Sequence, residues 1–156
     1  MAFLLDERKL GGFHFNDRKY ADDDLTLGSI HPYELFLIYN EIVDAQKDIN
    51  LKEDVELIAF MIDQSHNVKP KIEAMIQSVV NAQIAYAKAL LVEREKLVKA
   101  QKEGNIIEAE QILINTFQTD VKPLLEKLRL EMGLDPNPIK AYKESNYYNK
   151  IREERG

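Results

Sequence analysis

Asp63 and His66 have the spacing of a metal-binding pair on one helical face, and Glu34 and Glu41 lie on an earlier predicted helix. Helical bundles can hold two iron ions through such residues, with one Glu on each of two helices and a Glu-x-x-His on each of two others. The sequence has a single Asp-x-x-His of this kind and no second copy. A metal-dependent bundle enzyme therefore stays an alternative only, and we interpret His66 as a polar residue near a helix C-terminus.

The run Tyr20-Ala21-Asp22-Asp23 matches the metal-binding signature of reverse transcriptases. A polymerase needs that run on a β-hairpin between apolar strands, with a further carboxylate on another strand to hold two metal ions. The rest of this sequence is predicted to be helical and offers no such sheet. We therefore interpret Asp22 to Asp24 as a polar turn, in which Asp side chains bond to nearby backbone groups.

Other catalytic motifs are incomplete in this sequence. The pyrophosphohydrolase pieces Glu41-Ile42-Val43-Asp44 and Glu53-Asp54-Val55-Glu56 occur in the wrong order. The glycine pair Gly11-Gly12 lacks the Lys-Ser/Thr of a phosphate loop, and no Gly-x-Ser-x-Gly turn is present. We therefore expect no catalytic residue, no metal site, no cofactor and no enzymatic activity.

The composition is typical of one folded domain. Hydrophobic residues make up 45% of the chain and charged residues 31%, and the net charge of −6 argues against nucleic-acid binding. No apolar run approaches the roughly 18 residues of a membrane helix, and the N-terminus does not resemble a signal peptide. There is no cysteine. These features favour a protein of the cytoplasm, or one assembled there into a virion, that is not secreted by a signal peptide.

The apolar periodicity predicts an all-α fold. We expect a bundle of five or six helices with a long central helix, preceded by an extended or β-hairpin N-terminal arm. We divide the chain into the arm (1–28), the bundle (29–133), and a turn with a C-terminal helix (134–156). The helices are expected at 32–48, 50–67, 71–103, 105–118, 119–132 and 139–154.

The two ends of the chain are rich in apolar and aromatic side chains, which are common in protein interfaces. The residues that we predict to bind a partner are Phe3, Leu4, Leu5, Phe13, Phe15, Tyr142, Tyr147 and Tyr148. The arm could equally fold back onto its own bundle, and the sequence leaves both arrangements open.

In its size, arm, helical bundle and lack of enzyme motifs, the chain resembles small phage virion and assembly proteins, although no specific motif carries this resemblance. It implies a non-enzymatic structural or assembly protein that forms homo- or hetero-oligomers through its termini and bundle surface. A soluble regulatory protein or assembly chaperone, acting through a groove along 71–103, is a further alternative.

Overall fold

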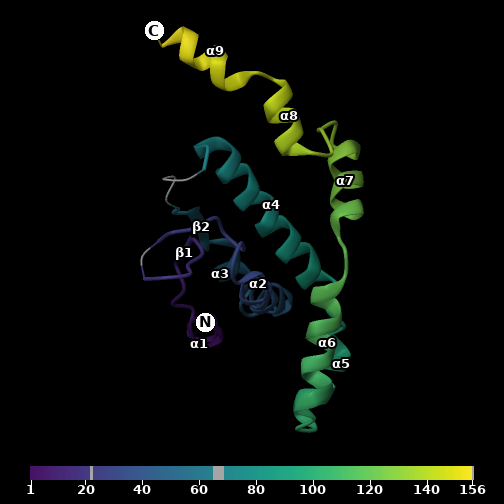
Figure 1. Cartoon of the computed structure of the whole chain (residues 1–156). Coiled ribbons are helices and arrows are strands. Elements are labelled where there is room, and N and C mark those ends of the chain that lie inside the picture. Colours follow the sequence, from purple (N-terminus) through teal and green to yellow (C-terminus); the bar gives the residue numbers. More distant parts are fainter. Residues whose placement is uncertain (22, 65–68, 156) are drawn as a thin grey trace.

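The computed structural model describes residues 1–21, 23–64 and 69–155. This part of the chain is mostly helical, which confirms the predicted all-α class, and it contains one small parallel sheet (Figure 1). The elements are α1 (Ala2–Asp6), β1 (Gly12–Phe15), α2 (Pro32–Lys47), α3 (Lys52–Glu56), β2 (Ala59–Ile62), α4 (Lys71–Leu90), α5 (Arg94–Lys102), α6 (Ile106–Gln118), α7 (Lys122–Glu131), α8 (Pro138–Glu144) and α9 (Tyr147–Glu154).

Helix α2 forms the centre of the core. Pro32 occupies its first turn, where a missing N–H costs no helical hydrogen bond. Phe36, Tyr39 and Val43 are buried, at the three- and four-residue spacings that place side chains on one side of a helix. This apolar side packs against α4, which crosses the molecule diagonally in Figure 1.

The predicted long helix is divided into α4 and α5, whose axes differ by 68°. Arg94 stabilises the bend, because its Nη2 atom donates to the carbonyl of Ala89 at 3.3 Å and to that of Asn40 at 3.0 Å. The bend allows Val92 and Leu97 to enter the core beside α2. The continuous helical pattern of the sequence did not indicate this interruption.

Two helix boundaries are marked by capping residues, Gly104 and Asn105. Gly104 ends α5 with a positive φ of 68°, a conformation that glycine adopts without steric cost. Asn105 then caps α6, because its side chain accepts a hydrogen bond from the N–H of Glu108 and donates one to its carboxylate.

The helix predicted over 50–67 is wrong for the described residues 57–64. α3 is short, and Ala59–Ile62 forms β2, which pairs in parallel with β1 in the register Gly12 to Ala59 and Phe15 to Ile62. The four residues 65–68 lie outside the described part of the chain. Parallel strands need a long crossover, and here α2 and α3 supply it.

The N-terminal arm folds back onto the bundle. Leu5 of α1 and Phe15 of β1 are both buried in the main core cluster. At the other end of the chain, α8 and α9 extend past the N-terminal end of α4 (Figure 1). Lys143 of α8 is held there by an ion pair with Glu73 of α4, at 3.1 Å.

The molecule is unusually open for its mass. It exposes 10805 Å², whereas a compact monomer of 18.1 kDa is expected to expose about 8,000 Å². Among the described residues, no helix by itself has the length and apolar composition to cross a membrane, and α4 and α5 together pass that test only as a strongly bent pair.

Candidate functional site

Asp17 lies just beyond the carboxyl end of β1 and is the most extensively bonded carboxylate described. Its Oδ2 atom accepts hydrogen bonds from the backbone N–H groups of Ile30 at 2.7 Å and His31 at 2.9 Å. Its Oδ1 atom accepts from the N–H of Arg18 at 2.8 Å and lies 2.7 Å from Nδ1 of His31. The side chain is 5% exposed, whereas the imidazole of His31 is 43% exposed. A buried carboxylate thus orients an accessible imidazole.

The environment of Asp17 favours its ionised form. Burial by itself would raise the pKa of this carboxyl group, but the hydrogen bonds from His31, Ile30 and Arg18 together outweigh burial and lower the pKa below its ordinary value. Asp17 therefore provides a fixed negative charge at the end of the sheet.

The loop between β1 and α2 is held in place by short-range pairing. Asp17 and Leu25 exchange two backbone hydrogen bonds, at 3.0 and 2.6 Å. Asn16 donates to the carboxylate of Asp24 at 2.7 Å. These bonds bring the beginning and the end of the loop together, so Asp17 reaches the start of α2.

Helix α4 ties this loop to the region after β2. The hydroxyl of Ser78, which is fully buried, accepts a hydrogen bond from the N–H of Leu27 and donates one to Oε1 of Gln64. Asn81 donates to the carbonyl of Leu27 at 2.6 Å, and Lys69 donates to the hydroxyl of Thr26 at 3.0 Å. These bonds join the end of the loop, at Thr26 and Leu27, to α4 and to Gln64, which follows β2.

The second carboxylate at this end of the sheet is exposed. Asp63 directly follows β2, and its Oδ2 atom lies 3.6 Å from Nδ1 of His14, a residue of β1. Both side chains are about two-thirds exposed. Such a pair contributes little to stability, but it adds a second imidazole and carboxylate close to the strand ends.

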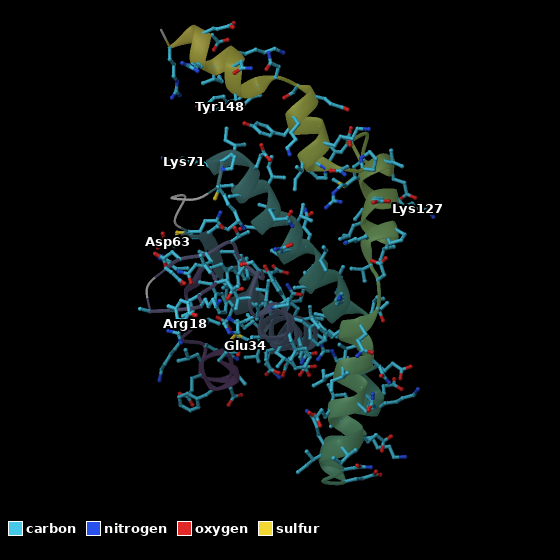
Figure 2. The ribbon with its side chains drawn as sticks, viewed as in Figure 1. Arg18, Glu34, Asp63, Lys71, Lys127 and Tyr148 are labelled. Atoms are coloured by element: carbon cyan, nitrogen blue, oxygen red, sulfur yellow. The ribbon has the colours of Figure 1, made fainter. Side chains whose placement is uncertain are left out.

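Among the residues that the structure describes, the acids of the metal set considered from the sequence come from separate elements. Asp63 follows β2, whereas Glu34 belongs to the first turn of α2, and the two extend from separate elements (Figure 2). Glu41 is also on α2, and His66 lies outside the described residues. Within the described residues, no three His, Cys, Asp or Glu side chains are placed to hold a metal ion.

The acidic run after Tyr20 forms part of a turn, in the segments that the structure describes. The carboxylate of Asp23 accepts hydrogen bonds from the backbone N–H groups of Lys19 and Tyr20. Asp24 is bonded to Asn16, and Asp22 lies outside the described residues. The polar turn inferred from the sequence is thus present at Asp23.

The residues predicted to bind a partner have different environments. Leu5 and Phe15 are buried, and Phe13 is half-buried with its ring stacked on that of Phe15 at 5.0 Å. The others remain partly or largely accessible; they are Phe3, Leu4, Tyr142, Tyr147 and Tyr148. Their role in partner binding stays a prediction.

Comparison with known proteins changes the functional interpretation. The chain is 45% identical over 155 residues to a Rhizobium meliloti protein named "Probable sugar isomerase", and the match covers 99% of this chain. It is 46% identical over 152 residues, or 97% of the chain, to a Mesorhizobium japonicum protein with the same descriptive name. The chain spans about a third of the length of these curated relatives, 35% in each case. No family model matches the sequence.

These matches overturn the functional predictions made from the sequence. A non-enzymatic structural or assembly protein was expected, with a regulatory protein or chaperone as an alternative, and both predictions are wrong because the relatives are named as enzymes. The expectation of no enzymatic activity is wrong for the same reason. Nothing in the matches supports a phage or virion component, so that resemblance is withdrawn.

The sequence contained two signals for this site, and the helical prediction over 50–67 obscured the first of them. The six apolar residues Leu57 to Ile62 are bounded by Glu56 and Asp63, which is the pattern of a short buried strand. The segment Gly12 to Phe15 is followed by a polar pair that ends in Asp17. In parallel sheets, ligands bind at the carboxyl ends of the strands, so acids in these positions are candidate site residues.

Proposed function

We propose that this chain forms one portion of a sugar isomerase and contributes Asp17 and His31 to its reaction site. The observation that carries the proposal is 45% identity to a probable sugar isomerase over 155 residues. A match of this extent covers β1, the loop after it and the start of α2, which are the segments that position the two residues.

A sugar isomerase of the aldose–ketose type moves a carbonyl group between the first two carbons of the sugar. One hydrogen leaves carbon 2 and another arrives at carbon 1, while a proton moves between the two oxygens, so the overall composition is unchanged. Each proton movement needs a group that can accept and then return it, held within hydrogen-bond reach of the sugar. Imidazoles and carboxylates are the side chains most often used for this purpose.

Asp17 and His31 have the arrangement that such a step requires. The carboxylate contacts the ring through Nδ1, which leaves Nε2 as the nitrogen available to a sugar hydroxyl. The negative charge of Asp17 stabilises the imidazolium form after a proton is accepted. In this proposal His31 exchanges the proton, and Asp17 positions the ring and holds the charge.

A chimera provides the test, because the relatives are about three times as long as this chain. The Rhizobium meliloti relative is prepared in its native form and with its matched segment replaced by this chain. Both proteins are assayed for interconversion of aldoses and ketoses across a panel of pentoses and hexoses. We expect isomerase activity in both the native relative and the chimera. If the native relative is active and the chimera is folded but inactive, the proposal is contradicted. A native relative that is inactive on the whole panel also contradicts it.

Site variants in the chimera test the roles of the two residues. Asp17→Asn and His31→Gln should each lower kcat/KM by about 100-fold or more, the usual contribution of acid–base catalysis. The matched control is Asp48→Asn, which changes an exposed turn carboxylate that accepts the N–H of Asn50 and should leave kcat/KM unchanged. If all three variants had the same kcat/KM, Asp17 and His31 would have no role in the reaction.

The cytoplasm stays the proposed location, because a chain without cysteine needs no oxidising compartment in order to fold. Protein partners also stay part of the proposal, since two-thirds of the length of the relatives has no counterpart in this chain.

A further inference from the structure

The two-stranded sheet has open edges. The N–H groups of Ala59 and Asp63 donate to β1, at the carbonyls of Gly11 and Phe15. Because amides alternate in direction along a strand, the N–H groups of Phe60 and Ile62 point to the opposite edge of β2. In the described part of the chain no third strand lies beside that edge. The outward N–H groups along this edge of β2 can therefore form hydrogen bonds to another strand.

One face of the sheet packs against α2 and the other is open. Phe15 and Phe60 stack with Tyr39 of α2, at ring distances of 5.8 and 6.3 Å. His14 and Met61 alternate with these rings and lie on the opposite face, where Met61 is 48% exposed. Parallel sheets are normally buried on both faces, so half of the expected covering is missing here.

The aromatic face is also incompletely covered. The ring of Phe60 lies within 6 Å of those of Phe13 and Phe15, yet Phe60 remains 46% exposed. A two-stranded unit is marginal by itself, and sheets normally contain several strands. The chain also exposes 10805 Å², which exceeds the value for a compact monomer by roughly a third.

We infer that the outer edge of β2 pairs in parallel with a further strand, supplied by the two-thirds of the sugar isomerase polypeptide that this chain does not match. This inference rests on the proposed function, because the matched relatives define what the rest of the polypeptide is. Pairing satisfies the outward amides of Phe60 and Ile62 and places side chains of the added strand beside Met61. It also places Asp17 and Asp63 at the rim of a larger sheet, where the reaction site would be completed by residues from other strands.

Hydrogen exchange at single residues tests the pairing directly. Exchange is measured by mass spectrometry with residue-resolved fragmentation, in this chain alone and in the chimera. The amides of Ala59 and Asp63, which already donate to β1, are the internal reference. We expect protection of the Phe60 and Ile62 amides to rise at least 100-fold in the chimera, well beyond any change at the reference amides. Unchanged protection of Phe60 and Ile62 overturns the inference.

Two variants and a control add a second readout. In the chimera, Phe60→Pro removes one outward N–H, and Met61→Lys places a charge beside the side chains of the strand that we expect to pair there. Each should lower the melting temperature of the chimera more than that of the isolated chain. Ile49→Lys is the control, because Ile49 is 90% exposed and lies away from β2. Equal shifts in both proteins for all three variants would contradict the docking of a strand.

The two hypotheses fail in different ways. An active chimera whose Phe60 and Ile62 amides gain no protection from hydrogen exchange would support the proposed function and contradict the strand pairing. A folded chimera in which these amides gain protection but which has no isomerase activity would support the strand pairing and contradict the proposed function.

Discussion

Oδ1 of Asp17 lies 2.7 Å from Nδ1 of His31, although fourteen positions separate the two residues in the sequence. The loop between β1 and α2 closes this distance, and the same carboxylate accepts the backbone N–H groups of Ile30 and His31. One buried acid thus fixes both the course of the loop and the orientation of the imidazole. Replacing it should therefore affect stability as well as activity.

Asp17→Asn should lower the free energy of unfolding of the chain by about 2 kcal/mol, since hydrogen bonds to a charged group contribute about 1.5–3 kcal/mol each and the amide keeps only some of them. Chemical denaturation at pH 7 measures this change. Asp48→Asn, at an exposed turn, should change the value by less than about 0.5 kcal/mol. Equal effects of the two substitutions would mean that the Asp17 bonds do not stabilise the loop.

Acid should weaken the chain through Asp17. Its pKa is lower in the folded state than in the unfolded state, where an Asp titrates near about 3.9. The folded state therefore binds fewer protons, and the stabilisation is complete above that pH and is lost as the pH falls through the folded-state pKa. The free energy of unfolding is measured for the native chain and for Asp17→Asn between about pH 6 and pH 2.5. The difference between the two values should shrink as the pH falls. A constant difference across this range would contradict the assignment.

Tyr39 should respond to alkali. Burial raises the pKa of its hydroxyl to about 12, so the folded state keeps this proton at a pH where an unfolded tyrosine, near about 10, has lost it. Its contribution to stability is therefore present below about pH 10 and falls as the pH rises towards 12. Tyr39→Phe should reduce the alkaline loss of stability and remove the last step of the absorbance titration. Tyr148→Phe, on an exposed ring, is the control and should do neither.

Arg94 should stabilise the bend between α4 and α5. Its guanidinium contacts two backbone carbonyls and lies 3.6 Å from the carboxylate of Asp44, and only 12% of the side chain is exposed. Arg94→Ala should lower the free energy of unfolding by about 2 kcal/mol, because it leaves the carbonyl of Asn40 without this donor. Lys96→Ala, which removes an exposed ion pair with Glu93, should leave it unchanged. Thermal melts of both variants decide the question.

Much of the helical fold could be predicted from local patterns. The helix that begins at Pro32 and the cap at Asn105 depend on interactions within a few residues, which a sequence records directly. The break before Arg94 and the strand Ala59–Ile62 depend on tertiary contacts, which override helical periodicity in an apolar run.

The site was harder to predict for the same reason. Asp17 and His31 become neighbours only through the loop, and His31 by itself reads as a residue at a helix start. The enzyme class named for the relatives could not be predicted from this chain, which spans 35% of the length of each.

The most direct test of the proposed function is the aldose-to-ketose ratio that the chimera produces. Two reactions are started, one from the pure aldose and one from the pure ketose, and ¹³C NMR measures the ratio over time. An isomerase accelerates both directions without moving the equilibrium, so the account predicts that the two reactions converge on one ratio. It also predicts that Asp17→Asn slows both approaches by the same factor of about 100 or more. A well-folded chimera that leaves both sugars unchanged, while the native relative interconverts them, would contradict the claim that this chain is part of a sugar isomerase.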